Sequence, residues 1–286
     1  MQIGVVFPQI EIGGDVGGVR AYAEAAAGLG YRHLLAYDHV LGADPAVHAG
    51  WAGPYDIANP FCEPMVLFGY LAAFSDLELV SGIVIGPQRQ SALLAKQAAQ
   101  VDVFCGGRLR LGLGLGWNRV EYDALGKDFT TRGKRLEEQV ALLRALFTKE
   151  SVTMRTSEED VVGAGINPMP IQRPIPIWLG AASPPALRRA GRLADGWFPL
   201  IPPDQRFADA KALVDEGAHA AGRDPATIPF EGRVSWNGDP ALFERQLEKW
   251  RALDAPYLSI NTMGAGFSGV DAHIEAIAGA VEVWRA

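Results

Sequence analysis

The sequence is poor in several features that mark particular classes of protein. Only two cysteines, Cys62 and Cys105, occur among 286 residues, and they form neither a CxxC motif nor a zinc-ligand spacing. A disulfide framework is implausible in a chain of this length, so we expect two free thiols in a reducing cytoplasm. The five histidines are scattered without an HExxH spacing, which predicts no metal centre.

Basic charge and long apolar stretches are also scarce. The 26 Lys and Arg residues are outnumbered by 33 Asp and Glu, so the net charge is −7 and we expect no nucleic-acid partner. No uncharged apolar run reaches the roughly 18 residues of a membrane span, and no signal peptide is recognisable at the start, so we expect a cytoplasmic protein without membrane association. The sequence has no Gly-x-Ser-x-Gly motif, which argues against an α/β-hydrolase.

What the sequence does contain is a regular alternation of short apolar runs and segments with helical periodicity. This alternation is typical of a parallel sheet built from βα units. The predicted strands are 3–7, 33–37, 77–85, 109–115, 175–179, 196–200, 228–234 and 257–261. The predicted helices are 19–29, 63–74, 91–104, 136–147, 204–221, 240–253 and 274–284, with one more that opens at Ser183.

Eight such units suit a closed (β/α)8 TIM barrel of the α/β class, formed as a single domain over 1–286. A doubly wound open sheet is the alternative. In a TIM barrel the active site lies at the carboxyl ends of the strands, so the candidate functional residues are those that end or directly follow a strand.

The second predicted strand ends at Tyr37, and Asp38 and His39 follow it. Histidine titrates closest to neutral pH of all side chains, so it is suited to give or take a proton. We therefore predict that His39 and Asp38 are catalytic. The alternative is that both residues merely cap the end of a strand.

Glycines stand at the ends of the third and fourth predicted strands. Gly82 allows a ligand to approach the backbone closely, although a simple turn explains it equally well. Gly114 and Gly116 leave one face of the fourth strand bare, which provides room for a flat ring unless packing inside the barrel requires them. Trp117 stands where a Rossmann GxGxxG motif needs glycine, which excludes that motif.

The fifth predicted strand leads into a helix through the small residues Gly180, Ala181 and Ser183. Free backbone N–H groups at a helix N-terminus favour a phosphate, so these residues are candidates for holding one. The alternative is an ordinary helix N-cap.

Three ordered groups of residues resemble the luciferase-like monooxygenase superfamily. As a set they are specific for the superfamily and cover most of 1–200, whereas the region after Asp204 carries little of the resemblance. They comprise 82–89, 94–99 and 106–109; then 112–119, 121–122, 125–126 and 132–133; and finally 176–180, 186–190 and 193–197.

This resemblance implies a bacterial-luciferase-like barrel whose mouth binds a flavin or the deazaflavin coenzyme F420. The chain looks most like the actinobacterial branch that uses F420, in which a pair similar to Asp38 and His39 faces the deazaflavin ring. The resemblance also implies a non-prolyl cis peptide between Gly82 and Ile83 that backs the ring. Further cofactor contacts are expected from Gly114, Gly116, Trp117, Gly180, Ala181 and Ser183.

The function implied is hydride transfer between F420 and a small or medium organic substrate, with His39 exchanging a proton and Asp38 orienting it. We expect the aromatic side chains of Trp51, Tyr55, Phe61 and Trp117 to wall the substrate pocket. The segment 40–60 is too long for a plain connection, which indicates a lid or binding loop. Trp117 replaces the acidic residue of the F420-dependent sugar-phosphate dehydrogenases, so a glucose-6-phosphate-type activity is not expected.

Three alternatives stay open at this point. The chain is an FMN-dependent monooxygenase served by a separate flavin reductase, or a non-catalytic barrel that only binds a flavin or deazaflavin. An aldolase-like enzyme ranks last because it would need a lysine at a strand end, and none stands there. The resemblance further implies a homodimer.

Overall fold

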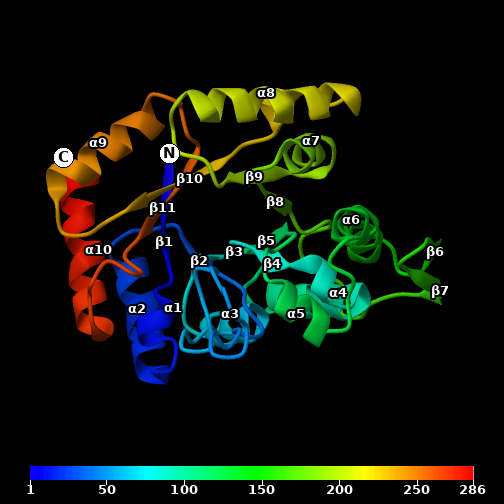
Figure 1. Cartoon of the computed structure of the whole chain (residues 1–286), viewed down its shortest axis with the longest axis horizontal. Coiled ribbons are helices and arrows are strands. Elements are labelled where there is room, and N and C mark those ends of the chain that lie inside the picture. The colour runs from blue at the N-terminus through cyan, green and yellow to red at the C-terminus, as the bar shows by residue number, and fades with distance from the viewer. Residues whose placement is uncertain (286) are drawn as a thin grey trace.

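The computed structural model describes residues 1–285 and shows a barrel of parallel strands with helices on its outside (Figure 1). The order around the sheet is β10-β11-β1-β2-β3-β5-β8-β9. A parallel bridge between Trp197 and Phe230 joins β9 to the start of β10 and closes the ring. This arrangement confirms the predicted (β/α)8 TIM barrel, and the open doubly wound sheet is wrong.

All eight predicted units are present, with boundaries shifted by a few residues. The barrel strands are β1 (Gln2–Val6), β2 (His33–Ala36), β3 (Glu78–Ser81), β5 (Leu109–Gly114), β8 (Ile177–Ala181), β9 (Gly196–Pro199), β10 (Glu231–Ser235) and β11 (Tyr257–Asn261). The surrounding helices are α2 (Val16–Gly28), α3 (Pro64–Leu71), α4 (Ser91–Phe104), α6 (Arg132–Thr148), α7 (Pro184–Leu193), α8 (Gln205–Ala220), α9 (Pro240–Arg251) and α10 (Gly269–Arg285). Within residues 1–285, no helix combines the length and apolar character needed to cross a membrane.

The third predicted strand, 77–85, is not continuous. β3 ends at Ser81, and the peptide between Gly82 and Ile83 is cis, as the resemblance implied. A two-residue strand, β4 (Val84–Ile85), then resumes the pairing with β5. The backbone therefore bulges toward the barrel axis at the active-site end of this strand.

Several short elements were not predicted. They are the helices α1 (Gln9–Ile12) and α5 (Arg119–Ala124), the 3-10 turns η1 (Gly86–Gln88) and η2 (Pro225–Thr227), and an antiparallel hairpin of β6 (Val152–Arg155) and β7 (Asp160–Ala164). The hairpin lies at the edge of the molecule, away from the barrel (Figure 1), and most of its side chains are at least partly exposed. It therefore lacks the buried apolar run by which the barrel strands were predicted.

Alternate side chains of the barrel strands pack in two separate cores. On β2, for example, Leu34 points outward to the large core between sheet and helices, whereas Leu35 points into the barrel. Leu35 packs there in one cluster with Val80 and Phe198, so the middle of the lumen is largely apolar.

Below this apolar layer, the amino-terminal end of the lumen holds a group of polar side chains, here called the basal polar cluster. Its members are His33, Glu78, Arg110, Glu231 and Ser259. The Arg110 guanidinium lies 2.6 Å from a Glu231 oxygen and 2.7 Å from a Glu78 oxygen, and it packs between the rings of Trp178 and Tyr257. Each buried charge of the cluster thus has an opposite charge in contact.

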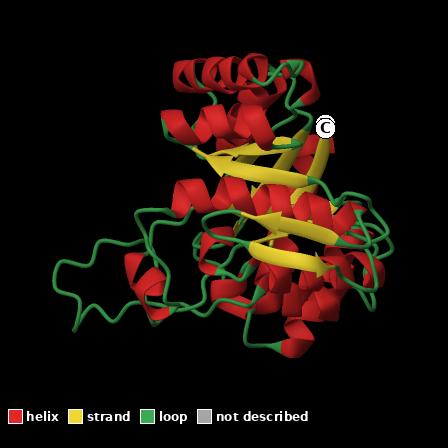
Figure 2. Cartoon of the chain, turned by 90° about the vertical axis from the view of Figure 1, so that its right-hand side faces the viewer, coloured by secondary structure: helices red, strands yellow, loops and turns green. Residues whose placement is uncertain are grey.

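The opposite, carboxyl-terminal end of the barrel carries the longest irregular connection. Residues 40–60, between β2 and α3, project from the body of the molecule as an extended loop (Figure 2). The residues at the strand ends beneath this loop form the candidate site.

Candidate active site

His39 lies directly after β2 in a cage of aromatic rings. Its imidazole contacts the rings of Phe61, Tyr55 and Trp117 edge to face, with centroid separations of 4.7, 5.3 and 5.4 Å. Such pairs contribute about 0.5–1.5 kcal/mol each beyond their buried area, so the cage fixes the orientation of the imidazole. We call Tyr55, Phe61 and Trp117 the aromatic cage. The residues expected to wall a pocket therefore gather around the predicted proton-exchanging residue.

The carboxylate that contacts His39 belongs to Glu121, on α5. One of its oxygens lies 3.5 Å from Nδ1 of His39 and also accepts hydrogen bonds from the backbone N–H groups of Val40 (2.6 Å) and Leu41 (3.1 Å). Burial alone would raise the pKa of Glu121, but the hydrogen bond from His39 and those from the backbone hold it below its ordinary value. Glu121 is therefore an anion at neutral pH that positions both the imidazole and the start of the long loop.

Asp38 does not have the orienting role expected for it. Its carboxylate is buried, forms an ion pair with Arg89 at 2.7 Å and accepts a hydrogen bond from the backbone N–H of Ile85 at 2.9 Å. Burial raises the pKa of Asp38, and the Arg89 charge opposes that rise. Asp38 points away from its sequence neighbour because adjacent residues in extended backbone face opposite sides. It thus anchors the segment after the cis peptide.

A local sequence signal for Glu121 exists. Asn118 is the N-cap of α5 and accepts hydrogen bonds from the backbone N–H groups of Val120 and Glu121. An Asn followed three residues later by Glu is typical of a helix start. Because this start directly follows the fourth barrel strand, it places Glu121 at the active-site end of the barrel.

The glycines at the ends of β5 and β8 accommodate the bulge after β3 instead of leaving an empty face. A β-carbon at Gly114 would lie 2.5 Å from the Ile83 side chain, and one at Gly180 would lie 3.2 Å from it. Gly116 has a φ of +67° and faces Ile85 in the same way. The expected room for a flat ring beside Gly114 and Gly116 is therefore occupied by isoleucine side chains, as the packing alternative anticipated.

Ile83 itself faces a small hollow in the barrel mouth. Leu35, Gly82, Gly180 and Phe198 line this hollow together with Ile83. β8 ends at Ala181, and Ser183 forms the N-cap of the ten-residue α7 without a side-chain hydrogen bond to the helix. Pro184 and Pro185 open α7 and have no N–H group, so Ala186 supplies the first backbone N–H of this helix beside the mouth.

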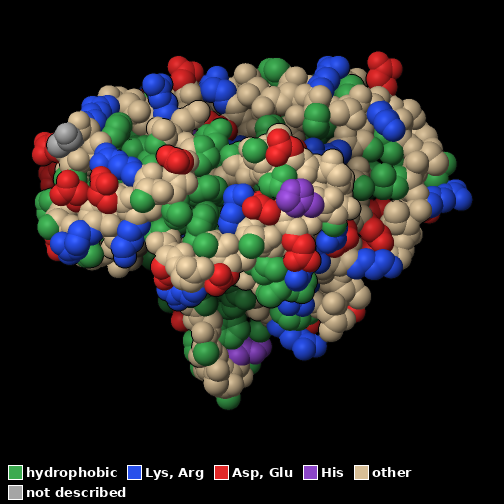
Figure 3. Space-filling model, turned by 90° about the horizontal axis from the view of Figure 1, so that it is seen from above, with side chains coloured by type: hydrophobic (Ala, Val, Ile, Leu, Met, Phe, Trp, Pro, Cys, Tyr) green, Lys and Arg blue, Asp and Glu red, His purple; other side chains and the backbone are tan. Residues whose placement is uncertain are grey.

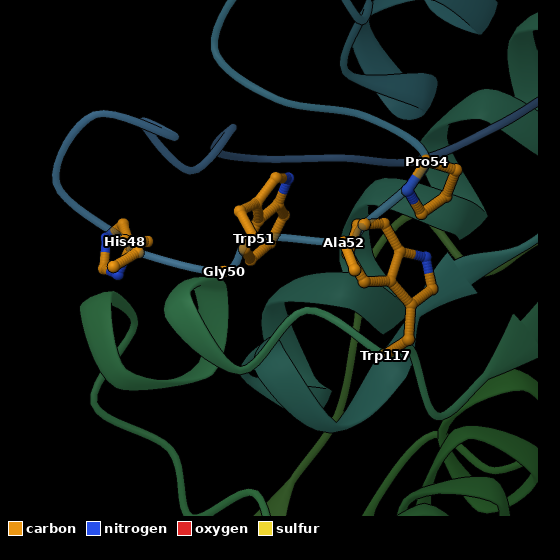
Figure 4. Close-up of a pocket in the computed structure, with 8 residues that line it drawn as sticks. His48, Gly50, Trp51, Ala52, Pro54 and Trp117 are labelled. Atoms are coloured by element: carbon orange, nitrogen blue, oxygen red, sulfur yellow. The ribbon is translucent and has the colours of Figure 1, made fainter.

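The long loop and Trp117 enclose a second, open cavity of about 500 Å³. Figure 4 shows His48, Trp51 and Pro54 along the loop, with Trp117 rising toward them from the segment after β5. The rings of Trp51 and Trp117 have centroids 5.6 Å apart, and a β-carbon at Gly53 would clash with both. In Figure 3 the projecting part of the molecule is mostly hydrophobic and uncharged. This cavity suits an apolar portion of a ligand.

Within residues 1–285, no group of three or more His, Cys, Asp or Glu side chains is placed to hold a metal ion. His39 and Glu121 are the titratable side chains at the mouth that contact each other.

The family model for luciferase-like monooxygenases matches residues 1–275. The chain belongs to this family. A phthiodiolone/phenolphthiodiolone dimycocerosates ketoreductase of Mycobacterium tuberculosis is 31% identical over 229 residues, which cover 73% of this chain and 59% of the ketoreductase. The luciferase-like chain thus spans about 60% of the length of the curated mycobacterial relatives it matches.

Solved structures share the fold over nearly the whole chain. A monooxygenase from Streptomyces bottropensis superposes with a TM-score of 0.78 at 18% identity and covers 100% of both chains. An F420-dependent secondary alcohol dehydrogenase, solved with an F420-acetone adduct, gives a TM-score of 0.78 at 14% identity and covers 100% of this chain and 99% of its own. These likenesses and the family match confirm the barrel and the resemblance recognised in the sequence.

Proposed function

We propose that this luciferase-like barrel is an oxidoreductase that transfers a hydride between coenzyme F420 and a small or medium organic substrate. The observation that carries the proposal is the pairing of His39 with the anionic Glu121 inside an aromatic cage at the barrel mouth. A histidine held in this way is suited to exchange a proton while a hydride moves at a neighbouring carbon. The mycobacterial ketoreductase and the F420-dependent dehydrogenase support the same reaction class.

The residues of the mouth fit a deazaflavin or flavin. Ile83, Leu35 and Phe198 provide an apolar surface for a ring, and Gly180 leaves the strand end bare beside it. Ala181, Ser183 and the backbone N–H of Ala186 would hold the cofactor phosphate, since Pro184 and Pro185 have no N–H to offer. When bound, F420 supplies the carbon that accepts or donates the hydride.

The chain itself contributes position, proton transfer and exclusion of water. Glu121 contacts Nδ1 of His39 and orients the ring, which leaves the opposite nitrogen, Nε2, for a substrate oxygen. The rings of Tyr55, Phe61 and Trp117 pack around the imidazole and limit access by water. The cavity of about 500 Å³ beside Trp51 provides space for the rest of the substrate.

An FMN-dependent monooxygenase with a separate flavin reductase is the second candidate. The family description and the likeness to the Streptomyces monooxygenase favour it. FMN and F420 each contain a flat ring and a phosphate, so the apolar surface at Ile83 and the start of α7 suit either cofactor.

A paired titration of the purified apo-protein with F420 and with FMN, followed by tryptophan fluorescence, separates the candidates. Trp117, which is 40% exposed, reports on ligands that enter the mouth. Tighter binding of F420 supports the proposal, and tighter binding of FMN moves the chain to the monooxygenase class. Binding of neither overturns both.

A further inference from the structure

Arg233 stands in the barrel mouth on β10 without an acidic partner. Its Nη1 donates a hydrogen bond of 2.6 Å to the Tyr37 hydroxyl, and its guanidinium carbon lies 5.6 Å from the centroid of the same ring. Among residues 1–285, no carboxylate lies within 4.0 Å of this guanidinium. The guanidinium therefore retains unused donors, including the Nε–Nη2 edge that matches a planar carboxylate.

Arg233 is exposed to solvent at the mouth, whereas Arg110 is buried inside the barrel. Arg110 lies at the basal end and contacts two carboxylates, those of Glu78 and Glu231. Glu231 is only two residues before Arg233 on the same strand and lines the same hollow, but its oxygens contact His33, Arg110 and Ser259. Arg233 therefore forms no ion pair with Glu231, and its remaining donors face the hollow.

Two hollows meet at Arg233. The inner hollow is the one described above in the barrel mouth, beside Ile83 and Phe198. An outer recess of about 330 Å³ adjoins it, and Pro199, Leu200 and Arg233 line both. The outer recess lies between the end of β9 and α9, where Lys249 is a second cation without a carboxylate within ion-pair distance in the described chain. In the described chain, β9 and β10 pair with each other only at the bridge between Trp197 and Phe230. The recess opens where this pairing ends.

Arg233 and His39 belong to one continuous region of the mouth. Tyr55 contacts the His39 ring at a centroid separation of 5.3 Å. Tyr37, whose hydroxyl accepts the hydrogen bond from Arg233, stands two residues before His39 at the end of the same strand. A molecule of modest size can therefore contact Arg233 while another of its atoms lies beside His39.

From this arrangement we infer that the substrate is an organic acid whose carboxylate binds Arg233 beside the Tyr37 hydroxyl. This inference rests on the proposed function, because it names the substrate class of the same site. The carboxylate pairs with the Nε–Nη2 edge of the guanidinium, and the carbon that exchanges the hydride then lies toward His39. Lys249, at the outer end of the recess, attracts the anion without contacting it in the bound position.

The test is isothermal titration calorimetry of the full chain with sodium benzoate and with benzamide, its uncharged analogue of the same shape. We expect benzoate to bind at least tenfold more tightly than benzamide. Arg233→Met should weaken benzoate binding at least tenfold and leave benzamide binding within twofold. Lys249→Met should leave both affinities within twofold at 0.15 M salt. Unchanged benzoate affinity in Arg233→Met overturns the inference.

Two further measurements show whether Arg233 prefers a carboxylate to a phosphate, and whether its anion belongs to the substrate or to the cofactor. If inorganic phosphate binds more tightly than benzoate, the assignment of a carboxylate is wrong. If Arg233→Met weakens F420 binding tenfold, the arginine holds an anionic group of the cofactor, and the inference about the substrate falls. Arginine-dependent benzoate binding by a chain that binds neither F420 nor FMN supports the anion site and removes the proposed redox function.

Discussion

The two ends of the barrel lumen handle buried polar groups in opposite ways. At the basal end, Arg110 is neutralised by Glu78 and Glu231 and enclosed by two aromatic rings. At the mouth, Arg233 has only a neutral hydroxyl as partner, and His39 has one carboxylate at 3.5 Å. The charges of the basal cluster are paired with one another and serve stability, although Nδ1 of His33 has no hydrogen-bond partner. The groups at the mouth have fewer charged partners and are available for binding and chemistry.

The largest effect that this comparison predicts is on catalysis at the mouth. Replacing His39 with Ala should lower kcat by about 10²–10⁴-fold, because the proton donor is removed. Cofactor affinity should change far less, because the ring contacts Ile83 and its neighbours in the proposed site. Steady-state kinetics and fluorescence titration measure the two quantities. His219→Ala, on the exposed face of α8, is the matched control and should leave both unchanged. Unaltered kcat in His39→Ala would end the assignment.

The second prediction concerns the basal end. Arg110→Met should lower the free energy of unfolding by about 3–5 kcal/mol, because it leaves the buried carboxylate of Glu231 and the partly exposed carboxylate of Glu78 without this cation. Arg233→Met, at the mouth, should cost about 1 kcal/mol or less, since no charge there depends on it. Urea unfolding of both variants gives the comparison. Equal losses would contradict the division between the two ends.

The same contrast predicts a pH dependence of stability. Burial alone would raise the pKa of Glu231, but the charges of His33 and Arg110 lower it to about 2, whereas the unfolded chain titrates near 4.5. A lowered pKa contributes stability that is fully present above 4.5 and is lost as the pH falls toward 2. Urea unfolding between pH 5 and pH 2 should therefore show a shallower loss in Glu231→Gln than in the natural chain. Parallel curves would show that Glu231 does not carry the acid sensitivity.

The barrel was predictable because its strands are short buried runs bounded by glycine and proline, and each precedes a helical stretch. The hairpin of β6 and β7 escaped because its residues are mostly exposed and carry no such run. The break at Gly82 and Ile83 could not come from apolar periodicity, since both halves of 77–85 are equally buried and apolar. Only the family resemblance indicated it.

The site was predictable in position but not in pairing. The rule that function lies at strand ends selected His39, and the aromatic residues expected nearby do surround it. The partner of His39 was assigned to Asp38 because the two are adjacent in sequence. Glu121, 82 residues further along, contacts the imidazole because α5 begins after β5, and only β3 separates β5 from β2 in the barrel. Such a contact depends on the arrangement of the strands in space, which spacing along the chain does not encode.

The smallest predicted effect tests whether Glu121, and not Asp38, is the residue that orients His39. Glu121→Gln keeps an oxygen that accepts the N–H groups of Val40 and Leu41 but removes the negative charge beside His39. We expect kcat to fall about tenfold and the pH–rate profile to change, because the anion that contacts and orients the imidazole is removed.

Asp38→Asn is the comparison variant, because its carboxylate pairs with Arg89 and not with His39. This substitution should lower the free energy of unfolding and leave the midpoints of the pH–rate profile in place. A shift in the profile of Asp38→Asn, with none in Glu121→Gln, would restore Asp38 as the residue that orients His39. A shift in Glu121→Gln with none in Asp38→Asn would show that one anion, Glu121, acts on His39 at the mouth. At the basal end, by contrast, two anions contact Arg110.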